Sequence, residues 1–251
     1  IVASVRAVAE GRCEAVVSAG STGAAMAASL FGLGRIHGVT RPAIAVTLPT
    51  MKKPVVLIDG GANSDCTPEM LSQFAEMGLV YAKHIVGVDN PKVGILSIGE
   101  EEGKGNALVK ETYPLLKEKH EQGRIEFAGN IEGKELFINK CDVVVCDGFA
   151  GNVALKVTEG TASMLLKMIS TEFKSDFLGC LIGLLAKPFL RRILKRTNWE
   201  DFGGMLLLGV KGISVIAHGR SSSYAMKNAV RAAVRVLNKD INSKIAENIN
   251  R

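Results

Sequence analysis

The 251-residue sequence lacks the patterns that mark many enzymes with a nucleophilic side chain, a catalytic zinc ion or a nicotinamide. It contains no Gly-x-Ser-x-Gly nucleophile motif, no His-Glu-x-x-His motif and no complete Gly-x-Gly-x-x-Gly fingerprint. Its four histidines are far apart in the chain, so no Cys–His pair is evident. The sequence therefore shows no evident residues for covalent catalysis or redox chemistry, and we predict neither a metal site nor a cofactor.

Cysteine and aromatic residues are also sparse. Five scattered cysteines form no Cys-x-x-Cys pair, and aromatic residues make up 5% of the chain. An odd number of isolated cysteines argues against a disulfide framework or a zinc site, and it favours a reducing cytoplasm. We expect most of these thiols to be small buried apolar groups.

Apolar segments of strand length are abundant, and helical patterns separate many of them. The predicted strands cover residues 15–18, 43–48, 55–59, 93–98, 125–128, 143–146, 204–209 and 213–217. Strands alternating with helices predict a three-layer α/β/α sandwich with a mostly parallel sheet covered on both faces. Because open parallel sheets bind ligands at the carboxyl ends of their strands, we expect the polar loops after the strands to collect at one edge.

The first of these loops is a glycine turn between a predicted strand and an Ala-rich helix. Its residues are Gly20, Ser21, Thr22 and Gly23. Backbone N–H groups and the positive end of the helix dipole at such a turn favour an anion, most simply a phosphate. The same residues also suit a turn that only caps the helix, and the segment by itself supports both interpretations equally.

Three further polar loops follow predicted strands: Asp59–Asn63, Gly99–Asn106 and Asp147–Lys156. Lys104 lies between two glycines, which would let its ammonium group approach an oxyanion closely. Asn152 could cap a helix or donate to a developing negative charge. Turn formation, helix capping or a solvated charge run are the structural alternatives. Among the histidines, His218 is the one expected near a site.

Residues 158–196 change to a nearly continuous helical pattern. Residues 177–186 are apolar on all sides, and a basic amphipathic segment follows Pro188. The apolar part is shorter than the roughly 20 residues that span a bilayer, so an interfacial or self-association element at about residues 170–200 fits better. A buried helix hairpin or homodimer contact is the alternative. The residues on which either interpretation depends are Leu181, Leu184, Leu185, Arg191 and Arg192.

The net charge is +6, with an isoelectric point near 9.1. Such a balance suits nucleic acid, an anionic membrane surface or an acidic protein partner. Basic stripes interleaved with aromatic residues are missing, so nucleic acid is not an expected partner.

Taken in order, five segments resemble the bacterial phosphate acyltransferases of phospholipid synthesis, the PlsX family. They are GSTGA at 20–24, DGGAN at 59–63, GEEEGKGN at 99–106, DGFAGNVALK at 147–156 and the glycine-bounded segment 203–212. The resemblance covers essentially the whole chain as one α/β domain, 1–251. Two departures stand out. The family's N-terminal strand with Asp-Ala-Met-Gly-Gly-Asp has no counterpart here, and Ser21 stands where the family usually has Asn.

This resemblance implies a fold related to phosphotransacetylases and to isocitrate and isopropylmalate dehydrogenases. It implies conversion of acyl-[acyl-carrier-protein] and inorganic phosphate to acyl phosphate and free carrier protein, with no cofactor. It further implies a cytoplasmic homodimer bound peripherally to an anionic membrane. A membrane glycerol-3-phosphate acyltransferase would act next and feed the acyl group into phospholipid.

The implied roles follow the matched residues. A phosphate held by residues 20–23 would attack the thioester, so no enzyme nucleophile is needed, and Lys104 and Asn152 would stabilise the oxyanion. The remaining cleft residues are Asp59, Asn63, Glu100, Asn106, Asp147, Lys156 and His218. Two alternatives stay open: a phosphotransacetylase-like enzyme that uses acyl-CoA, and a catalytically silent scaffold for membrane or carrier protein. A metal-dependent decarboxylating dehydrogenase fits less well, because no arginine-rich substrate site is evident.

Overall fold

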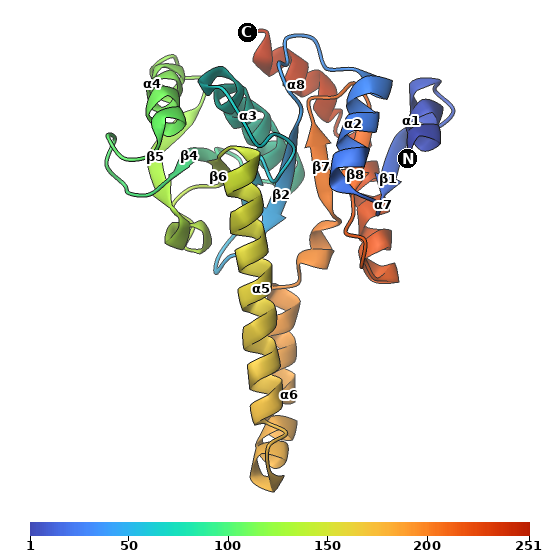
Figure 1. The fold of residues 1–251 in the computed structure, drawn as a ribbon, viewed down its shortest axis with the longest axis vertical. Helices are drawn as coiled ribbons and strands as arrows, with labels where there is room; N and C mark the ends of the chain where they lie inside the picture. Colours follow the sequence, from blue (N-terminus) through green and yellow to red (C-terminus); the bar gives the residue numbers. More distant parts are fainter.

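The protein is built on one eight-stranded sheet (Figure 1). The computed structural model describes residues 1–251, apart from the side chains of Arg196 and Trp199. The spatial order of the strands is β1-β8-β7-β2-β3-β6-β4-β5. Their bounds are β1 Ala15–Ser18, β2 Ala43–Leu48, β3 Val55–Ile58, β4 Lys92–Ser97, β5 Glu126–Glu132, β6 Val143–Val145, β7 Met205–Leu208 and β8 Ile213–Ile216. All eight predicted strands are present, with ends shifted by a few residues at most.

The sheet is mixed, and this corrects one expectation. The β1–β8, β3–β6, β6–β4 and β4–β5 pairs are parallel, whereas β7 is antiparallel to β8 and β2, and β2 is also antiparallel to β3. As a result, β1 and β8 run opposite to β3, β6 and β4. Their carboxyl ends lie at opposite edges of the sheet, so the prediction that all polar loops collect at one edge was wrong.

Most helices begin at a side-chain cap. The long ones are α2 Thr22–Leu33, α3 Pro68–Tyr81, α4 Ala107–Glu121, α5 Gly148–Glu172, α6 Phe177–Arg196 and α7 Ser223–Asn238, with the shorter α1 Val2–Ala9 and α8 Ile241–Ile249. The helical pattern of residues 158–196 is in fact broken, and so is the C-terminal helical segment. Residues 173–176 separate α5 from α6, and Asp240, in a left-handed conformation with φ 46°, separates α7 from α8. Such a turn interrupts helical hydrogen bonding, which periodicity alone does not reveal.

Helices cover both faces of the sheet, but they cover them unequally. One face packs against α3, α4, α7 and α8 in a large core that includes Phe74, Leu116 and Ile245. The other face packs against α2, the first turns of α5 and the short helix η2 (Gly133–Phe137), with Ala25, Leu155 and Leu136 in a smaller core. The three-layer architecture is therefore as predicted, with one face less completely covered.

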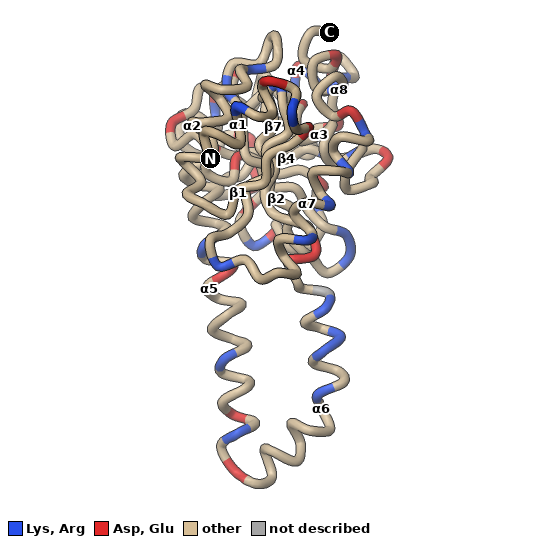
Figure 2. Tube along the Cα trace, turned by 90° about the vertical axis from the view of Figure 1, so that its right-hand side faces the viewer, with Lys and Arg blue, Asp and Glu red and all other residues tan. Residues whose placement is uncertain are grey.

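The helices α5 and α6 project away from the sheet as a hairpin. Figure 1 shows the hairpin extending well beyond the body, and Figure 2 shows its two arms splayed apart and joined only at the tip. Only the start of α5, with Leu155, contributes to the core. None of the described helices is long and apolar enough to cross a membrane.

Candidate functional site

A cavity of about 390 Å³ lies where the start of α2 faces the second turn of α5. Five segments that are distant in the sequence line it: the glycine turn before α2, the turn after β3, helix α5, the start of β7 and the loop after β8. The lining residues are Gly20, Ser21, Thr22, Gly60, Gly61, Asn152, Leu155, Lys156, Met205, Ala217, His218 and Gly219. Gly23 belongs to the same turn but does not line the cavity.

The start of α2 presents an anion-binding geometry to this cavity. Ser21 is the N-cap, and its hydroxyl oxygen accepts a long hydrogen bond of 3.5 Å from the N–H of Ala24. The first N–H groups of a helix have no partner within the helix, and the helix dipole places partial positive charge there. Capping and anion binding are thus compatible at this turn, since the cap uses one donor of the first turn only.

Asp59 holds the Gly60–Gly61 turn, which lines the cavity opposite the start of α2. Its side chain is fully buried, and it accepts five hydrogen bonds that fix the Gly60–Gly61 turn. The donors are the backbone N–H groups of Ile44 (3.0 Å), Gly61 (3.1 Å), Ala62 (2.9 Å) and Asn63 (2.7 Å) and the Asn63 side-chain amide (2.9 Å).

The predicted cleft residues Asp59 and Asn63 therefore act by holding backbone. Burial raises the pKa of the Asp59 carboxyl above its ordinary value, and its N–H donors limit the rise. The Asn63 amide also donates to the carbonyl of Pro42 at 2.8 Å. Neither side chain lines the cavity, but both position the glycine turn that does.

At the start of α5, one residue caps the helix and another faces the cavity, two roles that the sequence did not distinguish for Asn152. Asp147 is the N-cap, and its carboxylate accepts a hydrogen bond of 2.7 Å from the N–H of Ala150. Asn152, one turn further on, lines the cavity beside Gly61, so it is not the cap. Lys156 follows on the same face and pairs with Glu159 at 2.8 Å. Asn152 is therefore positioned to donate to a bound ligand.

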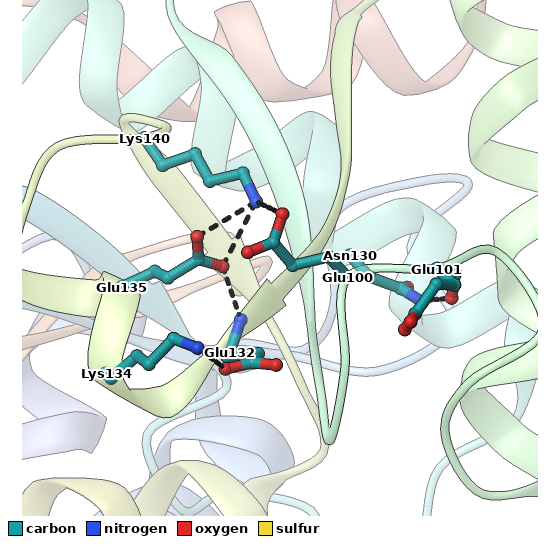
Figure 3. Close-up of polar contacts among 7 residues, drawn as sticks. All are labelled: Glu100, Glu101, Asn130, Glu132, Lys134, Glu135 and Lys140. Atoms are coloured by element: carbon teal, nitrogen blue, oxygen red, sulfur yellow. Dashed lines mark hydrogen bonds and ion pairs between the residues drawn. The ribbon is translucent and has the colours of Figure 1, made fainter.

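The loop of residues 99–106 lies apart from this cavity. Figure 3 shows Glu100 turned toward Lys140, with Nζ and Oε2 3.0 Å apart, and Lys140 also pairs with Glu135 at 3.0 Å. The side-chain amide of Asn130 donates to the carbonyl of Glu101 at 2.6 Å. Lys134 pairs with Glu132 on the neighbouring turn. The loop is thereby tied to the region around β5 and η2.

Two other predicted site residues belong to this loop. The Asn106 side chain caps α4, accepting a hydrogen bond of 2.9 Å from the N–H of Val109. Lys104 does not line the cavity. Its loop follows β4, which lies beyond β3 and β6 in the sheet and therefore further from β1 and the α2 turn. The structure therefore brings together Ser21, Asn152, Lys156 and His218, but not Lys104 or Glu100.

The loop after β8 completes the cavity. His218 lines it, and the histidine Nδ1 accepts a hydrogen bond of 3.1 Å from the N–H of Arg220. Leu155, Met205 and Gly219 also line the cavity and were not predicted. No sequence signal distinguishes them, because each is an ordinary apolar or turn residue whose position depends on how the strands pair.

The cysteine thiols near the site are held in their protonated form. Burial raises the pKa of Cys66 to about 12, and it raises the pKa of Cys146 well above its ordinary value. The thiolate is the nucleophilic form of cysteine, so neither residue is activated at neutral pH. Among the described residues, no group of three or more His, Cys, Asp or Glu side chains is arranged to hold a metal ion.

The fold defines a class. A phosphotransacetylase structure from Streptococcus pyogenes matches 94% of this chain and 67% of its own, with a TM-score of 0.62 at 17% identity. The EutD phosphotransacetylase from Staphylococcus aureus matches 93% of this chain and 66% of its own, with a TM-score of 0.59 at 14% identity. The protein therefore has the α/β fold of the phosphotransacetylases.

Sequence comparison then gives the family. The family model described as fatty acid synthesis protein matches residues 1–244. A phosphate acyltransferase from Heliobacterium modesticaldum is 50% identical over 99% of this chain and 73% of its own length. One from Dictyoglomus turgidum is 47% identical over 100% of this chain and 74% of its own. The chain belongs to this family, the phosphate acyltransferases.

Proposed function

We propose that the protein transfers an acyl group from the thioester of acyl carrier protein to inorganic phosphate. The products are acyl phosphate and free carrier protein. The observation that carries this proposal is the cavity in which the start of α2 faces Asn152, Lys156 and His218. It offers anion-binding donors, and the thiols near it are unactivated. Bound phosphate is therefore the natural nucleophile.

The proposed reaction depends on how the enzyme positions the two substrates, and it needs no covalent enzyme intermediate. Phosphate bound against Ser21 and Thr22 attacks the thioester carbonyl, forming the phosphate O–C bond and a tetrahedral oxyanion. Collapse of this intermediate breaks the C–S bond, and the thiolate leaves and takes up a proton. Asn152 donates to the oxyanion, and stabilisation of that kind commonly contributes most to the rate of acyl transfer. Holding phosphate beside the carbonyl supplies much of the remainder.

Lys104 is the proposed second donor to the oxyanion, on the strength of the resemblance and its flanking glycines. Because it does not line the cavity, this role requires residues 99–106 to approach the bound substrates. The Glu100–Lys140 pair restrains that loop, and this gives Glu100 a positioning role.

Two substitutions test these assignments. Asn152→Ala and Lys104→Ala, each checked for unchanged folding, should lower acyl phosphate formation from acyl carrier protein roughly 10²-fold or more, the effect typical of a lost oxyanion donor. Lys110→Ala, an exposed lysine on α4, is the matched control and should leave the rate unchanged. Near-normal rates in both variants would overturn the assignment.

The fold similarity to phosphotransacetylases also supports an acyl-CoA substrate. The same cavity could take either thioester, since the reacting group is identical. The net charge of +6 favours the acidic carrier protein, because electrostatic steering speeds association with an oppositely charged partner. Comparing rates with acyl carrier protein and acyl-CoA at low and high salt separates the two. Product from neither thioester would favour a silent scaffold.

We further propose that the α5–α6 hairpin binds an anionic membrane surface peripherally. Leu181, Leu184 and Leu185 are exposed, and Leu185 is 68% accessible. The basic residues of α6 lie further along the same helix, in blue on Figure 2, and the Arg192 guanidinium sits 4.8 Å from the Phe189 ring centroid. An apolar surface beside cations is the combination that binds anionic interfaces.

Changing the three leucines together to serine should release the protein from vesicles that contain anionic lipid. Phe31→Ser, which removes an even more exposed apolar side chain on the body, is the control and should keep binding. Removing the charges with Arg191→Gln and Arg192→Gln should weaken binding more at low than at high salt.

Vesicle binding that is unchanged in the triple variant would instead mean that the hairpin is a homodimer contact. The molecular mass of that variant in solution would then fall to that of a monomer. On the membrane, the acyl phosphate would pass to the glycerol-3-phosphate acyltransferase that the resemblance implies.

A further inference from the structure

A second cavity, of about 270 Å³, continues from the cavity at the start of α2, which is called the phosphate cavity below. It lies near the point where the hairpin leaves the body. The two cavities share four lining residues: Leu155, Lys156, Met205 and His218. Beyond them, the second cavity runs between the end of β2, the helix η2 and the first turns of α5. Besides the shared residues, its lining includes Val46, Leu48, Pro49, Phe137, Ala162 and Phe202. It forms a groove on the less covered face of the sheet.

Most of the residues that line this groove are apolar. Its ionisable residues are Lys156, Glu159 and His218, and the first two pair with each other at 2.8 Å. The hydroxyls that border it already have partners: Thr158 donates to the Ala154 carbonyl at 2.8 Å, Thr197 to the Ile193 carbonyl at 3.1 Å, and Thr47 bonds Tyr81 at 3.1 Å. A ligand in the groove therefore meets mainly methyl, methylene and aromatic groups. A polar ligand would lose its hydrogen bonds to water without replacement there.

Helix α5 joins the two cavities along one face. Leu155, Glu159 and Ala162 are spaced by three or four residues, so they lie on the same side of the helix, and all three line the groove. One turn nearer the start of α5, Asn152 lines the phosphate cavity. A ligand that extends along this face therefore meets the proposed reaction centre at one end and apolar surface at the other.

We propose that this groove holds the fatty acyl chain of the thioester substrate, with its carbonyl beside Asn152 and its methyl end toward Leu48 and Phe137. This inference rests on the proposed function. It deepens that function by assigning the chain to one surface of the protein and by making α5 a specificity-determining element. Burial of each additional methylene should improve kcat/KM by roughly fourfold until the groove is filled.

The test blocks the groove without touching the core. Ala162 lies on an exposed turn of α5, so Ala162→Phe adds bulk in the groove with little cost to folding. The neighbouring Thr161 is equally exposed but lines neither cavity, so Thr161→Phe is the matched control. Rates of acyl phosphate formation are compared for acetyl, octanoyl and palmitoyl thioesters of the same carrier.

Ala162→Phe should lower kcat/KM for the palmitoyl thioester tenfold or more and leave the acetyl thioester unchanged, while Thr161→Phe changes neither. An equal loss for all chain lengths, or no loss for palmitoyl, would overturn the groove assignment while leaving the proposed reaction intact. The proposed reaction itself fails if the unmodified protein converts none of the thioesters.

A binding measurement, which needs no turnover, distinguishes failure of the groove assignment from failure of the proposed reaction. Binding of a fluorescent fatty acid to the unmodified protein, and its displacement by palmitate, reports on the groove alone. Ala162→Phe should weaken this binding tenfold or more, and Thr161→Phe should not. Equal binding by both variants would overturn the groove even if the protein were active.

Discussion

The body of the protein and its α5–α6 hairpin use the same kinds of apolar residue in opposite ways. In the body, Phe74 is completely buried between α3 and the sheet, whereas Phe177 at the start of α6 is 87% exposed. The arms of the hairpin lie apart in Figure 2, and both carry exposed apolar side chains, such as Met168 on α5 and Leu184 on α6. A contiguous exposed apolar surface of this kind is typical of a membrane or protein contact.

Helix α5 belongs to both regions, which makes the comparison unusually direct. Its first turns pack on the sheet, cap through Asp147 and supply Asn152 to the site. Its later turns carry exposed residues such as Met164 and Ile169. One continuous helix thus runs from the proposed reaction centre to the surface that would contact lipid or a second subunit.

The largest expected difference between the regions is in stability. Phe74→Ala should lower the free energy of unfolding by about 3–5 kcal/mol, because it leaves a cavity in the core. Phe177→Ala should change it by less than about 0.5 kcal/mol, as at most exposed positions. Urea titration of both variants measures the contrast. Similar losses in the two would mean that Phe177 is buried in solution, for instance in a dimer.

Two glycines of α5 should respond in opposite directions. A Cβ at Gly151 would overlap the carbonyl oxygen of Asp59, whereas one at Gly160 would meet nothing. Gly151→Ala should therefore destabilise the protein by about 1–3 kcal/mol, since the helix must move off the sheet. Gly160→Ala should stabilise it by up to about 1 kcal/mol through helix propensity. Thermal unfolding tests both, and a destabilised Gly160→Ala would show that residue to be packed.

Cysteine labelling should distinguish the regions without changing stability. Cys180 on α6 is exposed, whereas Cys146 in the body is buried with its pKa raised well above the ordinary value. A maleimide should modify Cys180 rapidly and Cys146 only on unfolding, as mass spectrometry of the fragments would report. Anionic vesicles should slow labelling of Cys180 and leave the exposed Cys13 on the body unaffected. Equal protection of both would contradict the assignment of the membrane contact to the hairpin.

The smallest expected effect is on pH dependence, and it belongs to the body alone. Burial raises the pKa of Asp59 above 3.8, so its charged form is favoured less in the folded protein than in the unfolded chain. Stability from this group is therefore complete below pH 3.8 and is lost as the pH rises through the folded pKa. Relative to Asp59→Asn, the unmodified protein should lose stability over that range. A gain instead would mean that the five hydrogen-bond donors outweigh burial.

The sequence predicted the strands well because each is a short apolar run bounded by turn residues, and that signal is local. It could not predict that β2 would insert antiparallel between β7 and β3, because strand pairing joins segments far apart in the chain. The order of the strands also separates Lys104 from the α2 turn, because β4 lies near the opposite end of the sheet from β1. The same limitation hid Leu155 and Met205 from the prediction of the site.

Sequence alone also predicted where the polar loops lie more reliably than it predicted the role of each polar side chain in them. Asp147 and Asn106 prove to be helix caps, and Asp59 holds a backbone turn, whereas Asn152 and His218 line the cavity. The four Asp and Asn side chains among them suit either role. The choice depends on which side of a turn or helix faces the neighbouring segment, and only packing determines that.

The chain by itself therefore determined the α/β class, the strands, the glycine turn before α2 and the family resemblance. These features are carried by contiguous residues, whose hydrophobic periodicity and turn chemistry act over a few positions. The tertiary structure decided the strand directions, the set of side chains that meet at the cavity, and the groove that continues from it. Those features depend on contacts between distant segments, which form only when the apolar faces of the sheet and helices are buried together.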